Sequence, residues 1–222
     1  MRMLVIAAHP DDEVLGCGGC IARVSGQSEV FTTIVTEGCS SQYSGENIDS
    51  MICGKKAAAE KAGRILGVKK VIFGDFPDMR LDTVGHTALN GFLERVIDEI
   101  RPDIVLTHHS GDINLDHQII YRSTIVAVRP GKGYPTRVLL YETPSATEWQ
   151  SYNAKYAFIP NLFVDITRTI ERKIEALRCY ETELRNFPHP RSEQGVRAYA
   201  AFRGLAAGVR AAEGYTLFRE VC

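Results

Sequence analysis

The chain has 222 residues, with 26 Lys and Arg against 27 Asp and Glu and a formal net charge of −1. This balance offers no basic surface for nucleic acid or an anionic membrane, and no apolar run approaches the roughly 20 residues that span a bilayer. A composition of 45% hydrophobic and 24% charged residues is typical of a soluble globular protein. The six cysteines show no framework-like spacing and the N-terminal apolar stretch is too short for a signal peptide, so a cytoplasmic protein with reduced thiols is expected.

Strand-length apolar segments alternate with helix-length segments through the first two thirds of the chain. The predicted strands are Met3–Ala8, Glu29–Thr36, Lys70–Phe73, Asp103–Thr107 and Arg137–Tyr141. The predicted helices are Asp12–Val24, Ile52–Leu66 (followed by a stop signal at Gly67), Thr87–Ile100 and Asp116–Val128. The alternation predicts an α/β fold, a Rossmann-like three-layer sandwich with a mostly parallel sheet and its active site at the carboxyl ends of the strands.

The last third of the chain is less regular. Its predicted elements are a strand at Asn161–Ile166, a helix at Thr167–Leu184 and a last helix at Ser192–Ala212 that begins at Ser192 or Glu193. Two prolines force residues 186–192 into a loop, and the polar stretch Glu37–Ser50 is predicted to be a mobile loop near the site. No linker divides the chain, so residues 1–222 are predicted to form a single domain.

Residues 8–13 (AHPDDE) lie where the first strand ends and the first helix begins. His9 and Asp12 are three residues apart across a proline-stiffened turn, so an imidazole and a carboxylate can converge on one cation such as zinc. Asp11 would point elsewhere while staying close, which is what a general base beside a metal-bound water requires. Alternatively, the two aspartates only cap the helix and complement its dipole. A buried histidine beside two carboxylates favours the metal site, because it is costly without a partner.

Residues 108–117 (HHSGDINLDH) follow the fourth predicted strand. His117, which starts a helix, can supply a third metal ligand, and three protein ligands plus water are typical of an open catalytic zinc site. A solvated turn is the alternative, because loops favour Asp, Asn, Ser and Gly for backbone reasons. Since both motifs end strands of one parallel sheet, they are expected to open onto the same crevice.

The first motif and the later D-x-N-x-D-H resemble the PIG-L/LmbE-like zinc-dependent N-acetylglucosaminyl deacetylases. The resemblance covers most of the chain and includes residues 14–19 (VLGCGG), 66–68 (LGV) and 76–81 (FPDMRL). It implies one Zn²⁺ per chain, replaceable by other divalent ions, with His9, Asp12 and His117 as ligands and Asp11 as the base. The implied reaction removes an acetyl group from an N-acetylated sugar and gives acetate and a free amine.

Two positions depart from the family pattern. Many members carry a histidine, acting as an acid or electrostatic partner, where this chain has Asn114. Asparagine cannot shuttle a proton, so either Asp11 handles both proton transfers or another group assists. The candidates for that group are His189, which we predict to be catalytic, and His108 and His109. The family also tends to place an arginine where this chain has Lys55, which keeps the charge but loses the bidentate fork.

The remaining predictions concern the substrate and partners. The predicted substrate-binding residues, for sugar hydroxyls or a phosphate, are Lys55, Asp78, Arg80 and Asn114. We expect a small N-acetylated sugar as partner, no nucleic acid and no membrane span, with a homo-oligomer left open. The alternatives are a metal-dependent hydrolase of another amide or a phosphoester, and a non-catalytic, metal-containing sugar-binding protein.

Three further signals favour packing over chemistry. Cys17 and Cys20 form a CxxC outside a thioredoxin-like context, so they are predicted to be packing cysteines. The glycines at 16, 18 and 19 fail the GxGxxG dinucleotide pattern because position 21 is Ile, and they are predicted to let the first helix pack closely on the sheet. Trp149 is the only tryptophan, and it suits either sugar stacking or packing.

Overall fold

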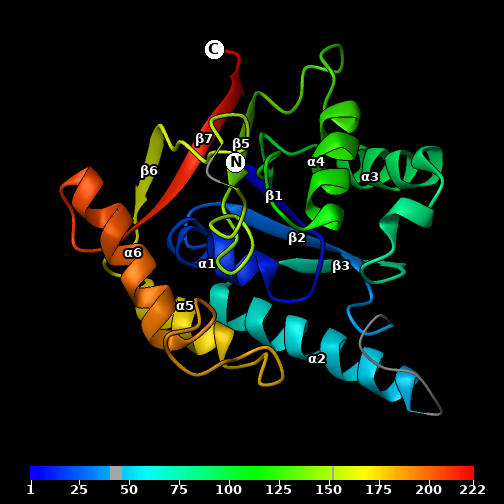
Figure 1. The fold of residues 1–222 in the computed structure, drawn as a ribbon. Coiled ribbons are helices and arrows are strands. Elements are labelled where there is room, and N and C mark those ends of the chain that lie inside the picture. The colour runs from blue at the N-terminus through cyan, green and yellow to red at the C-terminus, as the bar shows by residue number, and fades with distance from the viewer. Residues whose placement is uncertain (41–46, 152) are drawn as a thin grey trace.

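One mixed sheet organises the fold (Figure 1). The computed structural model describes residues 1–40, 47–151 and 153–222. Within these residues the sheet has seven strands in the order β3-β2-β1-β4-β5-β7-β6. Their bounds are β1 Arg2–Ala7, β2 Glu29–Thr36, β3 Lys70–Phe76, β4 Ile104–His108, β5 Arg137–Tyr141, β6 Leu162–Asp165 and β7 Ala212–Glu220.

Strands β1 to β5 pair in parallel, and β7 runs antiparallel to its neighbours β5 and β6. The prediction of an α/β fold with a mostly parallel sheet is therefore confirmed. The order 3-2-1-4-5 is that of doubly wound nucleotide-binding folds, and it reverses between β1 and β4. In such sheets the reversal point opens a crevice at the carboxyl ends of the two strands.

Helices cover both faces of the sheet and make three layers (Figure 1). Their bounds are α1 Asp12–Val24, α2 Ile48–Leu66, η1 Leu81–Thr83, α3 His86–Ile100, α4 Leu115–Ala127, α5 Ile170–Leu177 and α6 Glu193–Ala207. Successive side chains of a strand point to opposite faces. Accordingly Met3 and Val5 of β1 pack with α1, α2 and α5, whereas Leu4 and Ile6 pack with α3 and α4.

Two glycines act as the sequence predicts. Gly67 ends α2 with φ of 84°, a left-handed conformation that glycine adopts without steric penalty. Gly16 in α1 lies against the ring of Tyr141 from β5, so an added Cβ would collide with that ring. Gly16 therefore allows α1 to pack closely against Tyr141, and it is not part of a phosphate-binding loop. Cys17 and Cys20 on the same helix are buried free thiols, which fits packing cysteines.

The C-terminal third differs most from the predicted elements. The helix predicted at Thr167–Leu184 is shorter, because α5 spans only Ile170–Leu177. Beyond it the chain turns so that Tyr180 is buried and donates its hydroxyl to Glu13 Oε1 at 2.5 Å. Tyr180 and Glu13 are 167 residues apart in the sequence, so the periodicity of residues 167–184 does not reveal their contact.

The last helix begins as predicted but ends earlier. Ser192 Oγ accepts a hydrogen bond from the Gly195 amide at 2.9 Å and caps α6. The helix stops at Ala207 because Gly208 has φ of 71°, and residues from Ala212 onward form β7. The predicted end at Ala212 is therefore wrong.

The predicted loop Glu37–Ser50 is only partly described. Residues 41–46 lie outside the described residues, and residues 48–50 already belong to α2. Glu37 contacts the site region, because its Oε1 accepts from the backbone amide of Asp78 at 3.1 Å. In the described part of the chain, no helix has the length and apolar character needed to cross a membrane.

Candidate active site and metal centre

The two predicted motifs meet at the reversal point of the sheet. His9 follows β1, Asp12 is the first residue of α1, and His117 lies in the first turn of α4. Because β1 and β4 are adjacent and parallel, the loops that leave their carboxyl ends converge. Residues 108 positions apart in the chain are thereby brought into direct contact.

The side chains of His9, Asp12 and His117 form a compact triad of potential ligand atoms. His9 Nδ1 lies 3.2 Å from Asp12 Oδ2 and 3.2 Å from His117 Nε2, and His117 Nε2 lies 3.2 Å from Asp12 Oδ2. Tetrahedral zinc ligands at about 2.0–2.1 Å from the ion stand roughly 3.3–3.4 Å apart. The two nitrogens and one oxygen therefore fit a zinc ion in both donor type and spacing.

Each imidazole of the triad has a carboxylate next to its second ring nitrogen, the one that does not face the other triad atoms. Asp116 Oδ2 lies 3.1 Å from His9 Nε2, and Asp116 Oδ1 accepts from the Leu81 amide at 3.1 Å. Asp112 Oδ2 lies 3.2 Å from His117 Nδ1. Carboxylates in this position fix the tautomer and orientation of metal-binding histidines.

The electrostatics of the triad favour a bound cation. Burial alone would lower the pKa of His117, but Asp12 and Asp112 overcome this and raise it to about 9. Burial likewise disfavours the charged form of His9, yet hydrogen bonds to Asp116 and Asp12 raise its pKa well above the usual value. The carboxylates thus supply a local negative potential, which a proton or a metal ion can neutralise.

Asp11 is adjacent to the triad but does not belong to it. It precedes α1 with φ of 118°, a conformation that non-glycine residues rarely adopt and that is often found at functional sites. Its amide donates to Glu13 Oε2 at 3.2 Å, and its own Oδ2 lies 3.4 Å from Arg191 Nη1. Burial and the Asp12 charge raise the pKa of Asp11 well above its usual value, although Arg191 opposes the shift. This carboxyl can therefore exchange a proton beside the metal-ligand triad.

A cavity of about 440 Å³ opens over these groups. Its lining includes the triad, Asp11 and three of the four predicted substrate-binding residues, namely Lys55, Asp78 and Asn114. It also includes Glu183 and Arg191, which the sequence analysis missed. Lys55 Nζ donates to Glu183 Oε1, and Arg191 Nη1 donates to Glu183 Oε2 at 3.1 Å. The sequence feature that could have indicated Arg191 is the Pro-flanked loop of residues 186–192, because such loops often contain functional residues.

The other predicted polar residues have more specific positions. Asp78 Oδ1 lies 3.5 Å from His9 Nε2. Asn114 caps α4, because its Oδ1 accepts from the Asp116 amide at 2.9 Å. Arg80 is exposed, donates to Ser40 Oγ at 3.3 Å and does not line the described part of the cavity.

None of the three alternative histidines lines this cavity in the described structure. His108 is buried and its Nε2 accepts from the Ala8 amide at 2.9 Å; burial and His117 lower its pKa well below the usual value. His109 Nε2 donates to the Tyr156 carbonyl at 2.9 Å. His189 Nδ1 accepts from the Arg191 amide at 3.1 Å, and its ring meets Trp149 edge-on at 5.3 Å. His108 and His189 thus hold residues of the site in place from outside the cavity.

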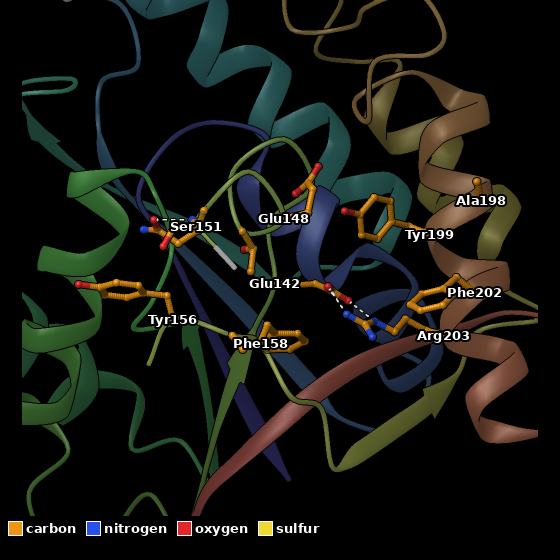
Figure 2. A pocket seen from close by; sticks show the side chains of 12 residues that line it. Glu142, Glu148, Ser151, Tyr156, Phe158, Ala198, Tyr199, Phe202 and Arg203 are labelled. Carbon is orange, nitrogen blue, oxygen red and sulfur yellow. Dashed lines mark hydrogen bonds and ion pairs between the residues drawn. The ribbon is translucent and has the colours of Figure 1, made fainter. Parts of the chain in front are cut away.

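A second cavity, of about 490 Å³, lies between residues 142–158 and α6 (Figure 2). It shares no described lining residue with the first cavity. Figure 2 shows its aromatic wall and the Arg203–Glu142 ion pair at its base. Thr147 lines the second cavity, and its Oγ1 donates at 2.7 Å to Asp112 Oδ2, the oxygen that lies 3.2 Å from His117 Nδ1.

Comparisons with known proteins agree with this geometry. The model of the PIG-L family (GlcNAc-PI de-N-acetylase) matches residues 4–128. The uncharacterized deacetylase YaiS of Escherichia coli is 30% identical over 172 residues, which cover 74% of this chain and 81% of that protein. Diacetylchitobiose deacetylase of Thermococcus kodakarensis is 29% identical over 232 residues, covering 100% of this chain and 86% of that protein.

A solved structure shows how widely the fold is used. The 4-carboxy-2-hydroxymuconate hydratase of Pseudomonas putida superposes with a TM-score of 0.80 at 21% identity, covering 100% of this chain and 97% of that one. The fold by itself therefore does not determine the reaction. The family match covers more than half of the chain and contains both motifs, and the two curated relatives are deacetylases. The chain belongs to the PIG-L family of GlcNAc-PI de-N-acetylases, as its motifs predicted.

Proposed function

We propose that the chain is a zinc-dependent hydrolase that removes the acetyl group from an N-acetylated sugar, giving acetate and a free amine. The observation that carries the proposal is the open triad of His9, Asp12 and His117 with the carboxylate of Asp11 beside it. Three protein ligands leave a position for water, which is typical of catalytic sites and not of structural ones. The two curated deacetylase relatives support the same reaction class.

Each residue of the site has a separate role in the proposed reaction. A bound Zn²⁺ would polarise the amide carbonyl and lower the pKa of a bound water toward about 7. Asp11 takes a proton from the attacking water and returns it to the sugar nitrogen as the carbon–nitrogen bond breaks. Asn114 has no proton to shuttle and is engaged as a helix cap, so Asp11 performs both transfers. Asp112 and Asp116 keep the two imidazoles in orientation.

The sugar would lie in the polar cavity beside the triad. Lys55 and Asp78 line it and offer donors and acceptors for hydroxyl groups. Arg80 and His189 lie outside the described lining, so we assign them no contact with the sugar. The proposed substrate class is an N-acetylglucosamine-type conjugate whose acetamido group enters this cavity beside the triad.

The direct test is acetate release from a panel of N-acetylglucosaminides by zinc-loaded protein. The panel contains the monosaccharide, its 1-phosphate and N,N'-diacetylchitobiose, each run beside a chelated control. Release that depends on metal, and that the Asp11→Asn variant loses while it retains zinc, is the expected result. Zinc bound without release from any member would contradict the proposal. In that case hydrolysis of another amide, or a non-catalytic sugar-binding protein, becomes the better interpretation.

A further inference from the structure

Arg191 occupies a position in the catalytic cavity that neither motif indicates. It lies in the Pro-flanked loop, and its side chain is about a quarter exposed at 26%. Its Nη1 is 3.1 Å from Glu183 Oε2 and 3.4 Å from Asp11 Oδ2. One end of the guanidinium is thus anchored by two carboxylates from different parts of the chain.

The other donors of this guanidinium are unused. Arginine carries five N–H donors in a planar fork. Nε is buried without a hydrogen-bond partner among the described residues, and Nη2 makes no hydrogen bond to them either. Other arginines of this chain use the same edge fully: Nε and Nη2 of Arg203 bind Glu142 at 2.7 and 2.6 Å. Nη2 is not among the buried unpaired atoms, so its N–H donors remain available to an oxygen acceptor of a ligand in the cavity.

The neighbourhood of Arg191 fits an oxygen-rich ligand. Lys55 shares the carboxylate of Glu183 with Arg191, so two cations line this part of the cavity together with the carboxyl groups of Glu183 and Asp11. Both cations are restrained by the same acid, and little side-chain freedom remains to be lost on binding. A guanidinium nitrogen fixed in this way can donate to an oxygen of the ligand, either a sugar hydroxyl or a phosphate.

We propose that Arg191 is a substrate-binding residue that donates from Nη2 to an oxygen of the sugar while Nη1 holds the Asp11 carboxylate in place. The inference rests on the proposed function for the identity of the ligand. It adds a specificity residue that lies 74 residues beyond His117 in the sequence.

The experiment compares Arg191→Met and Arg191→Lys with the matched control Arg185→Met. Arg185 is exposed, and among the described residues its side chain donates hydrogen bonds only to the carbonyls of Thr182 and Leu184. Binding of N-acetylglucosamine and of its 1-phosphate to zinc-loaded protein is measured by calorimetry, and acetate release is measured on both. We expect Arg191→Met to lose about 10- to 100-fold in affinity. Arg191→Lys should recover only part of it, and Arg185→Met should match the wild type.

The outcomes separate this inference from the proposed function. A larger loss for the 1-phosphate identifies a phosphate as the acceptor, and equal losses identify hydroxyls. Acetate release by the wild type with unchanged binding by Arg191→Met overturns the inference and leaves the proposed function standing. Binding that depends on Arg191 without any acetate release overturns the proposed function instead. An equal loss in Arg185→Met, or no binding of either sugar by the wild type, also overturns the inference.

Discussion

The contact between Asp116 and His9 predicts a specific defect in metal binding. His9 Nε2 lies 3.1 Å from Asp116 Oδ2, while the opposite nitrogen, Nδ1, faces the metal-ligand triad. The same carboxylate accepts from the Leu81 amide through Oδ1. Asp116→Asn preserves the shape but leaves one oxygen for two donors. Either His9 or Leu81 then loses its Asp116 acceptor, and of the two carboxylates behind His9 only Asp78, at 3.5 Å, keeps its charge.

The expected loss of zinc affinity follows from the hydrogen bond that Asp116→Asn removes. A hydrogen bond to a charged, buried acceptor contributes about 1.5–3 kcal/mol. Since 1.36 kcal/mol corresponds to a factor of ten, zinc affinity should fall roughly 10- to 100-fold. Asp12→Asn replaces a charged ligand carboxylate with a neutral amide and should weaken binding more than this.

The assay is zinc competition with a chromophoric chelator at neutral pH. The matched control is Asp82→Asn, which removes the same charge from an exposed neighbour within η1. Circular dichroism and a thermal melt confirm that each variant is folded. A folded Asp116→Asn protein whose zinc affinity lies within twofold of the wild type would refute the orienting role of this carboxylate.

Three further predictions follow from named contacts. Asp11→Asn should keep one metal per chain and lose turnover by about 10² or more, and full activity would exclude Asp11 as the base. For Glu183, burial raises the carboxyl pKa but its lysine partner lowers it to below the usual value, so its stabilisation is present above about pH 4.3 and is lost as pH falls through the folded pKa. The difference in unfolding free energy between the wild type and Glu183→Gln should therefore shrink as urea titrations move from pH 7 to pH 3, and a constant difference would contradict this. Gly16→Ala should destabilise by about 1–3 kcal/mol through its clash with a tyrosine ring. Gly54→Ala, at a helical position where an added Cβ meets no described atom, should stabilise by up to about 1 kcal/mol. Equal unfolding free energies for the Gly16→Ala and Gly54→Ala variants would count against the packing argument.

The sequence predicts the core of the fold because its signals are local. The five parallel strands, the stop of α2 at Gly67 and the cap of α6 at Ser192 each depend on residues close together in the chain. The C-terminal elements do not follow the same rule. Residues 215–218 (YTLF) favour a strand, but the position of β7 between β5 and β6 depends on antiparallel pairing with those distant segments.

The residues of the candidate site likewise fall into two groups, those that the sequence indicates and those that only the tertiary structure reveals. The sequence by itself indicates His9, Asp11 and Asp12, because a short turn after a buried strand restricts where their side chains can point, and it supplies His117 from a second strand end. Only the tertiary structure shows that Asp116 lies behind His9 and that Arg191 reaches Asp11 from the far end of the chain. Ligand spacing within a turn is set by covalent geometry. The contacts that orient those ligands and complete the cavity are set by packing between distant segments, which the order of residues does not display.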